Sequence, residues 1–356
     1  MSDQSGNSPT FSLLRVLVLA LPLAVAAYAG ASWYKGDIQR NADEDLAKTT
    51  IARMLGPQSQ LRMSDRYADS DGDLLADAPA DEADLIDPAE IAFSYVASTS
   101  APPETPWKEL LGALSEQLGK PVKYMRFTDP DEQLRALKAG DLHIAAFGTG
   151  EAPTAVNGAG FIPLVVPGDA QGRFGYTMKI IVPAASTMKD PKDIRGQRMT
   201  FTRPNSNSGF KAALVLLLDE YDLAPERDYK WGFSYGHEIS IEGIAKGELQ
   251  AASVASDILE RMIAAGEVSA DAIKTIYESE RFPPGTIGCA YNLKPELRNG
   301  IEKTLVGFGF AGTGLEEALG GSEAAEFVRI NYKNDWDNVR RIDAAAAKAR
   351  SELGGE

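Results

Sequence analysis

Largely apolar runs alternate with amphipathic segments from residue 91 towards the end of the chain. Residues 91–96 are typical of a buried strand, and residues 107–118 place four leucines at helical spacing. The same criteria predict a strand at 122–127, a helix at 131–139 and a strand at 143–147. Strands that alternate with helices in this way form a parallel sheet with helices on both faces.

The second half of the chain repeats this pattern, which predicts a second α/β lobe. The strands are expected at 178–182, 198–201, 229–233, 251–254, 275–277 and 286–290, and the helices at 190–194, 209–221, 239–246, 257–264, 295–308 and 322–341. We therefore predict two lobes, each a mostly parallel sheet flanked by helices. Residues 89–182 would begin lobe 1, residues 183–286 would form lobe 2, and residues 287–356 would return to lobe 1 and end in helices.

Residues 16–34 show a different pattern, because none of these 19 positions carries a charge. Such a run is just long enough to span a bilayer as a helix. Arg15 and Lys35 flank it, and its outer end is aromatic, which suits a membrane interface. We predict a transmembrane anchor, with residues 1–15 in the cytoplasm. A cleaved signal peptide, with small residues at 29–31 as the cleavage pattern, and a buried core helix are the alternatives.

The segment at 35–88 links this run to the lobes and has a third kind of composition. Its middle part, residues 65–87, is dominated by aspartate and alanine and has few large apolar side chains. A segment of this kind buries too little surface to order itself. We predict an acidic flexible stalk, with a short helix at 38–55 before it.

Composition excludes several classes of function. The chain has 356 residues and a net charge of −15, so bulk attraction to nucleic acid is not expected. One cysteine, Cys289, excludes an intrachain disulfide, and two histidines exclude a histidine-rich metal site. The chain has no nucleophile elbow, P-loop or dinucleotide fingerprint. We expect neither an enzyme nor a cofactor, although Glu151, His237 and Asp257 could in principle exchange protons.

The loop between the strand at 198–201 and the long apolar helix at 209–221 is the strongest candidate for a binding site. The first turn of a helix carries free N–H groups and partial positive charge, and it therefore binds anions. This loop also follows the carboxyl end of a strand, where open α/β sheets bind ligands. Its hydroxyl and amide side chains add donors, its glycine permits close approach and its arginine adds a charge. The candidate ligand-binding residues are Arg203, Ser206, Asn207, Ser208 and Gly209. Helix capping without a ligand is the alternative interpretation.

Other strand exits would bring polar groups to the same edge. The candidates are Thr149 and Gly150 after the strand at 143–147, His237 after 229–233, Asp257 after 251–254, and Thr99 after 91–96. Each has a plain structural alternative: a glycine turn, a structural hydrogen bond or a helix cap. Their convergence with the loop is what favours a binding site.

Several segments, taken in order, resemble the phosphate, phosphite and phosphonate binding proteins of ABC importers, a PhnD-like family with the type II periplasmic-binding-protein fold. The matching segments lie at 134–148, 190–196, 205–209, 236–238 and 256–261, and the resemblance covers about residues 91–341. It implies that the loop at 205–209 holds phosphoryl oxygens and that His237 contacts the ligand. The chain departs from the family pattern at Asn207, where the family has threonine, and at Glu151, which brings a carboxylate to a place where the family often has an aromatic wall.

Together, the patterns and the resemblance predict a two-lobed α/β binding protein with an N-terminal transmembrane helix. The protein would be a single-pass component of the inner (cytoplasmic) membrane, with its globular part in the periplasm. It would clamp a small oxyanion, similar to phosphonate, phosphite or phosphate, and deliver it to an ABC permease. The alternative is a membrane-tethered sensory or scaffold module with a diverged ligand pocket.

Overall fold

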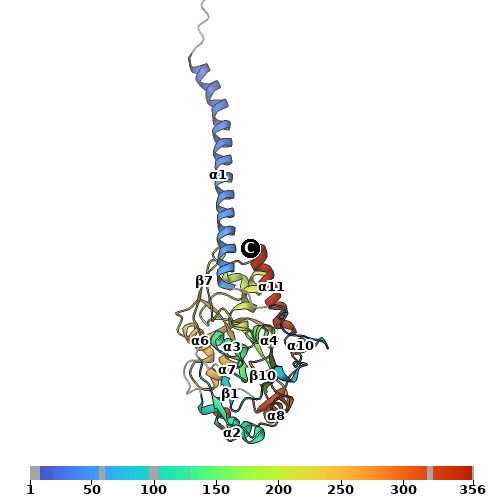
Figure 1. Ribbon diagram of the computed structural model, residues 1–356. Coiled ribbons are helices and arrows are strands. Elements are labelled where there is room, and N and C mark those ends of the chain that lie inside the picture. Colours follow the sequence, from blue (N-terminus) through green and yellow to red (C-terminus); the bar gives the residue numbers. More distant parts are fainter. Residues whose placement is uncertain (1–8, 56–60, 96–103, 128, 319–323, 355–356) are drawn as a thin grey trace, which may run out of the picture.

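The computed structural model describes residues 9–55, 61–95, 104–127, 129–318 and 324–354 of the chain. One long helix, α1 (Pro9–Leu55), projects from a globular part that contains two sheets (Figure 1). The C-terminal helix α11 (Asp337–Gly354) lies beside the base of α1, whereas α2 (Lys108–Leu118) and α8 (Pro295–Val306) lie at the opposite end.

Lobe 1 is built on a six-stranded sheet with the order β11-β4-β10-β3-β1-β2. β1 pairs in parallel with β2 and β3, whereas β10 runs antiparallel to β3 and β4, and β11 runs antiparallel to β4. The strands are β1 (Ile91–Tyr95), β2 (Val122–Tyr124), β3 (Ile144–Phe147), β4 (Phe161–Gly168), β10 (Thr286–Ala290) and β11 (Glu326–Arg329). The helices of this lobe are α2, α3 (Pro130–Ala139), α4 (Ala152–Ala159), α8 and α9 (Gly314–Ala318).

Lobe 2 is built on a five-stranded sheet with the order β7-β6-β8-β5-β9. β6 pairs in parallel with β7 and β8, and β5 runs antiparallel to β8 and β9. The strands are β5 (Tyr176–Pro183), β6 (Arg198–Phe201), β7 (Lys230–Phe233), β8 (Ala251–Ala255) and β9 (Ile273–Phe282). The helices are α5 (Ala212–Asp219), α6 (His237–Ala245) and α7 (Ser256–Ala264).

The two α/β lobes agree with the predicted fold class, but both sheets are mixed rather than mostly parallel. The chain passes to lobe 2 after β4 and returns after β9, and the strands next to these crossings pair antiparallel. β5 therefore belongs to lobe 2, whereas the sequence had assigned residues 178–182 to lobe 1.

Two strands of lobe 1 were not predicted. β4 contains Pro163 and Pro167, and proline is disfavoured inside a sheet because it cannot donate to the ladder. The pairing of β4 with β10 shifts register between Ile287 and Gly288, where an added side chain on Gly288 would collide with the Ile162 carbonyl. β11 lies inside the stretch at 322–341 for which a continuous helix was expected.

The C-terminal segment connects the two lobes. After β11, the short helix α10 (Tyr332–Asp335) is followed by Trp336, which is fully buried and donates from its indole nitrogen to the Thr149 carbonyl (3.0 Å). Helix α11 then packs against α5 of lobe 2 and against α1. The segment that was expected to end in lobe 1 thus reaches lobe 2 as well.

Helix α1 is continuous through both the predicted anchor at 16–34 and the short helix expected at 38–55. Its last turns are docked, because Ala47, Ile51 and Met54 are buried. Most side chains at 16–34 lie outside the described residues. Within the described part of the chain, no helix reaches the length and hydropathy of a membrane span.

Residues 61–90 differ from the expected flexible stalk, because they lie against the globular part. Asp77 accepts hydrogen bonds from the backbone and the hydroxyl of Ser70 (2.9 and 2.6 Å). The ring of Tyr67 packs edge-on against Tyr291 with centroids 4.9 Å apart, and Ile86 forms an isolated bridge to Leu293. Leu74, Leu75 and Ile86 also pack against the hydrophobic core, and aspartate hydrogen bonds to neighbouring backbone add to the order of this segment.

Candidate anion-binding site

The exits of β3 in lobe 1 and of β6, β7 and β8 in lobe 2 meet between the lobes. The two backbones come close together at Gly150, where an added Cβ would stand 2.5 Å from the Asn205 carbonyl oxygen and 2.9 Å from the Asn207 nitrogen. Only a residue without a side chain allows the two backbones to come this close. The two loops singled out in the sequence, one from each lobe, are therefore in contact.

The loop after β6 enters its helix through a wide turn. Residues Asn207–Lys211 form a π-helical turn that continues into α5, a feature often found at functional sites. Ser206 is the N-cap, and its hydroxyl accepts from the Gly209 nitrogen (3.0 Å). The Ser206 oxygen therefore caps the helix, as the alternative interpretation of this loop proposed. The hydroxyl hydrogen of Ser206 can still donate to a ligand.

Asn207 and Ser208 are buried polar residues of this turn, with 2% and 1% of their surface exposed, and Lys211 at its end is also buried. Neither polar atom of the Asn207 side chain makes a hydrogen bond of normal geometry within the described residues, and the same holds for the Thr202 hydroxyl. Asn207 and Ser208 do lie near the Tyr176 hydroxyl, since both side chains counteract the rise that burial causes in the pKa of Tyr176. Buried polar atoms are nearly always hydrogen-bonded, so these atoms mark a place where a polar partner fits. The helix start adds backbone N–H groups of the same kind.

The sequence suggested that Gly209 lets a ligand approach the backbone, but the structure gives a different reason for glycine at this position. A Cβ at this position would stand 1.8 Å from the Thr202 hydroxyl oxygen. Its missing side chain therefore makes room for the end of β6 against the helix start. The Gly209 carbonyl is also engaged, since it accepts from the Thr202 nitrogen (2.9 Å) and the Ser253 hydroxyl (2.8 Å).

The lobe 1 loop is already occupied by protein contacts. The Thr149 hydroxyl donates to the Pro283 carbonyl (2.7 Å) and accepts from Tyr176 (3.2 Å). Pro283 lies on the return from β9 to β10, so Thr149 ties this loop to the crossing between the lobes. Only the backbone N–H of Thr149 and that of Gly150 remain as donors for a ligand.

Glu151 turns back onto its own loop, where a carboxylate oxygen accepts from the Gly148 nitrogen (3.1 Å). Burial raises the pKa of this carboxyl, while that hydrogen bond and the positive charges of Arg203 and Lys211 act in the opposite direction. The carboxylate therefore lies within electrostatic reach of Arg203. The Arg203 guanidinium is held in place by donating to the Tyr235 carbonyl (3.0 Å).

His237 opens α6, and its Nδ1 accepts from the Ala255 nitrogen at the end of β8 (3.0 Å). The ring proton is therefore on Nε2, which is free to donate. Burial, with a smaller contribution from Arg203, lowers the pKa of His237 to about 4. At neutral pH the residue is an uncharged donor.

Asp257, in the first turn of α7, has a buried carboxylate oxygen without a partner in the described structure. Burial raises the pKa of this carboxyl. Tyr95, at the carboxyl end of β1, has a pKa raised by burial and by the nearby charges of Asp257 and Glu151. Tyr95 and Tyr176 were missed in the sequence, although an aromatic residue ending the first strand was a usable signal. Thr99 lies outside the described residues.

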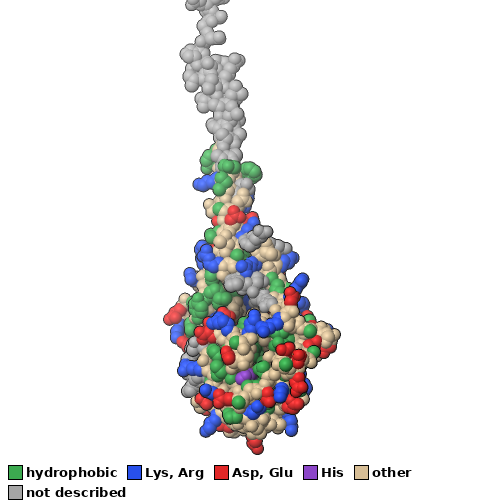
Figure 2. Space-filling view, viewed as in Figure 1, with side chains coloured by type: hydrophobic (Ala, Val, Ile, Leu, Met, Phe, Trp, Pro, Cys, Tyr) green, Lys and Arg blue, Asp and Glu red, His purple; other side chains and the backbone are tan. Residues whose placement is uncertain are grey.

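The site thus combines one charged donor, Arg203, and several neutral donors with two carboxylates. Neutral N–H and O–H groups can satisfy the oxygens of an oxyanion, and carboxylates can accept from an ammonium or hydroxyl group of the same solute. Figure 2 shows positive and negative side chains interspersed over the globular part, so recognition depends on local donors rather than on a uniform field.

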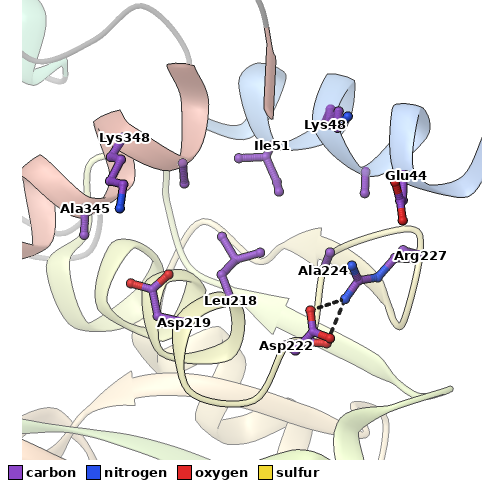
Figure 3. Close-up of a pocket in the computed structure, with 12 residues that line it drawn as sticks. Glu44, Lys48, Ile51, Leu218, Asp219, Asp222, Ala224, Arg227, Ala345 and Lys348 are labelled. Atoms are coloured by element: carbon purple, nitrogen blue, oxygen red, sulfur yellow. Dashed lines mark hydrogen bonds and ion pairs between the residues drawn. The ribbon is translucent and has the colours of Figure 1, made fainter. Parts of the chain in front are cut away.

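Two other concave or acidic features lie away from these strand exits. A cavity of about 270 Å³ lies where α1, α5 and α11 meet, with Ile51 and Leu218 on facing walls (Figure 3). Three carboxylates with a spacing that could hold a metal ion, those of Asp69, Asp71 and Asp73, belong to the segment at 61–90. Neither feature shares a residue with the strand exits.

The chain is similar to a known family of proteins. The model of the family described as "ABC transporter, phosphonate, periplasmic substrate-binding protein" matches residues 93–336. The phosphate-import protein PhnD of Mycolicibacterium smegmatis is 26% identical over 258 residues, which are 70% of this chain and 79% of that protein.

Two solved structures share the fold. The binding-protein component of an ABC phosphonate transporter from Pseudomonas aeruginosa superposes with a TM-score of 0.63 and 19% identity, over 76% of this chain and 90% of that one. PhnD1 from Prochlorococcus marinus, solved with methylphosphonate, gives a TM-score of 0.61 and 14% identity, over 74% of this chain and all of that one. Both likenesses confirm the predicted two-lobed fold.

Proposed function

Since the chain belongs to the periplasmic substrate-binding proteins of phosphonate ABC transporters, we propose that the exits of β3, β6, β7 and β8 form its ligand site. The ligand is a small phosphonate- or phosphate-like oxyanion, enclosed between the lobes and handed to a permease. Proteins of this family bind and deliver a solute without catalysis. The resemblance and the solute-binding function expected from the sequence are thereby confirmed, and with them the prediction that the chain is not an enzyme.

The observation that carries the proposed site is the Asn207 side chain, which is buried with both polar atoms unpartnered in the described structure. Its amide donates to a phosphoryl oxygen, and the backbone N–H groups of Asn207 and Ser208 add two more donors. From the facing side, His237 donates from Nε2. Each oxygen of the solute then has a partner, as burial of an oxyanion requires.

The carboxylates extend the proposal to the organic part of the ligand. Asp257 has a buried, unpartnered oxygen, and Glu151 lies within electrostatic reach of Arg203. A carboxylate beside an oxyanion is repulsive unless it accepts from an ammonium or hydroxyl group. Inorganic phosphate, methylphosphonate and 2-aminoethylphosphonate therefore separate the anion part of the site from this second part.

Calorimetric titration of the full chain with these three compounds tests the proposal, with Asn207→Leu as the variant. Asn207→Leu is expected to weaken binding of all three by roughly tenfold to a hundredfold, because it removes the buried amide that pairs with the phosphoryl group. Wild-type affinity for all three compounds in this variant would contradict the assigned site.

The N-terminal helix completes the proposal. The uncharged run at 16–34, between Arg15 and Lys35, anchors the protein in the inner membrane and leaves the lobes in the periplasm. The docking of Ala47, Ile51 and Met54 holds the globular part at the end of this helix. Fractionation of the full chain, compared with a chain in which two leucines of the run are replaced (Leu19→Asp/Leu23→Asp), tests the anchor. Equal recovery of both proteins in the membrane fraction would contradict it.

A sensory or scaffold role remains the second candidate, and the same docking supports it. Helix α1 packs against α11, so the proposed anchor contacts an element that also reaches the lobes. Calorimetry separates the two roles, since a scaffold module with a diverged pocket would bind none of the three compounds.

A further inference from the structure

A buried ion pair lies directly behind the candidate site. The Lys211 ammonium is 2.5 Å from an Asp343 carboxylate oxygen, and 7% and 4% of these side chains are exposed. Among the ion pairs of the described residues, this is the one in which both partners are buried. The same ammonium also donates to the Gly150 carbonyl at 2.9 Å.

These three residues belong to three different parts of the molecule. Lys211 ends the π-helical turn of lobe 2, Gly150 lies in the β3 exit of lobe 1, and Asp343 lies on the C-terminal helix α11. Lys211 therefore joins the turn Asn207–Lys211, the proposed anion-binding turn, to the opposing lobe and to α11. The contact between Gly150 and Asn207 lies beside this junction.

Fold stability does not explain a charge at this place. A buried ion pair loses hydration on burial, and replacing both partners by apolar residues of similar size is often neutral or stabilising. The second oxygen of Asp343 has no partner among the described residues, so the pair is not fully satisfied. A cation at the start of α5 also opposes the helix dipole. The distinctive contribution of Lys211 is its reach to the Gly150 carbonyl.

We propose that Lys211 is a positioning residue of the binding site, a cross-lobe latch that holds the β3 exit of lobe 1 against the anion-binding turn of lobe 2. Asp343 holds the ammonium at the point from which it reaches Gly150. The latch stabilises the closed arrangement before a ligand arrives, so the donors of both lobes are already in register when the solute binds. This inference rests on the proposed function only for the identity of that solute.

The test measures the distance between the two lobes in the absence of a ligand. Spin labels on Lys138→Cys in lobe 1 and Glu248→Cys in lobe 2 report this distance in the full chain, because both positions are exposed and the native Cys289 is buried. The variants are Lys211→Met and the double variant Lys211→Met/Asp343→Leu. Lys230→Met, which breaks a partly exposed pair with Glu226 inside lobe 2, is the matched control.

The unchanged chain and Lys230→Met are expected to give the same narrow distribution of short distances. Lys211→Met and the double variant are expected to give a longer and broader distribution, and inorganic phosphate is expected to dissociate about tenfold faster. The double variant leaves no buried unpaired charge, so its melting temperature is expected to stay near that of the unchanged chain. If Lys211→Met fails to fold, the double variant still tests the proposal.

A double variant that folds and keeps the short distances would overturn the latch, because a purely structural pair predicts that result. Failure of the unchanged chain to bind phosphate would count against the proposed ligand and would leave the distance measurement intact.

Discussion

The strand exits of lobe 1 and lobe 2 meet face to face, yet they differ in how far their polar groups are already paired. In lobe 1, the Thr149 hydroxyl is engaged with Pro283 and Tyr176, and the Glu151 carboxylate with Gly148. In lobe 2, both side-chain atoms of Asn207 and one oxygen of Asp257 have no partner in the described structure. On the proposed function, lobe 2 would therefore offer the groups that recognise a solute, and the β3 exit of lobe 1 would cover it.

The most severe test of this difference is a side chain added to the β3 exit of lobe 1. Gly150→Ala would place a methyl group 2.5 Å from the Asn205 carbonyl oxygen and 2.9 Å from the Asn207 nitrogen. Both atoms are backbone, so the lobes must separate. We expect affinity for inorganic phosphate, measured by calorimetry, to fall by roughly a hundredfold.

The matched control for this variant is Gly112→Ala in α2 of the same lobe, where an added Cβ meets nothing within 4 Å. It should leave affinity unchanged and stabilise the helix by up to about 1 kcal/mol. Wild-type affinity in Gly150→Ala would show that the closed contact between the lobes is not needed for binding.

We expect the two serines of the proposed anion-binding turn to separate recognition from folding within lobe 2. Ser208 is buried, whereas the Ser206 oxygen caps the turn through Gly209. Ser208→Ala is expected to weaken phosphate binding by about tenfold. Ser206→Ala is expected to lower the free energy of unfolding by about 1 kcal/mol, with a smaller change in affinity.

Calorimetry and urea unfolding of both serine variants measure these two quantities. The opposite assignment, with Ser208→Ala destabilising and Ser206→Ala weakening binding, would remove the distinction between the two roles.

The sequence indicated the free groups of the lobe 2 loop better than the paired state of the lobe 1 loop, for a physical reason. A polar loop between a strand and an apolar helix creates free N–H groups by local geometry alone, so residues 206–209 could be proposed as donors without a structure. The engagement of Thr149 depends on Pro283, which lies far along the chain. A pairing of this kind depends on tertiary contacts that periodicity does not encode.

The same reasoning explains where the fold prediction failed. The alternation of strands and helices revealed two α/β lobes, but antiparallel pairing of β5 with β8 and β9 depends on how the chain crosses between them. Residues 65–87 were expected to be flexible because they have few large apolar side chains. They are held by the packing of Leu74, Leu75 and Ile86 against the core and by hydrogen bonds such as that between Ser70 and Asp77, which composition does not predict.

A smaller effect is expected for the Glu151 carboxylate at the β3 exit of lobe 1. Glu151→Gln keeps an oxygen that can accept from Gly148 and removes a negative charge beside the proposed oxyanion. We expect methylphosphonate, which has no amine, to bind about threefold tighter, as suits one charge in a partly screened site. Calorimetry with 2-aminoethylphosphonate is the companion measurement, and weaker binding of methylphosphonate would contradict the placement of Glu151 near the anion.

The smallest expected effect compares one histidine from each lobe. His143 accepts from the Ala92 nitrogen in lobe 1, as His237 accepts from Ala255 in lobe 2, and burial lowers the pKa of both. Only His237 is also affected by the charge of Arg203, which helps to lower its pKa from 6.5 to about 4. Arg203→Gln should therefore raise the pKa of His237 while leaving it below 6.5, because burial is the larger cause.

The imidazole proton shifts, followed by NMR from about pH 7 to about pH 4, measure this change, and His143 is the internal control. A histidine whose pKa is depressed in the folded state contributes stability that is fully present above pH 6.5 and is lost as the pH falls towards 4. In Arg203→Gln this loss should be smaller, since the folded and unfolded pKa values lie closer together. If the pKa values of both histidines changed equally in Arg203→Gln, the effect of Arg203 would not be confined to the lobe 2 strand exits. The placement of its charge beside His237 would then have to be abandoned.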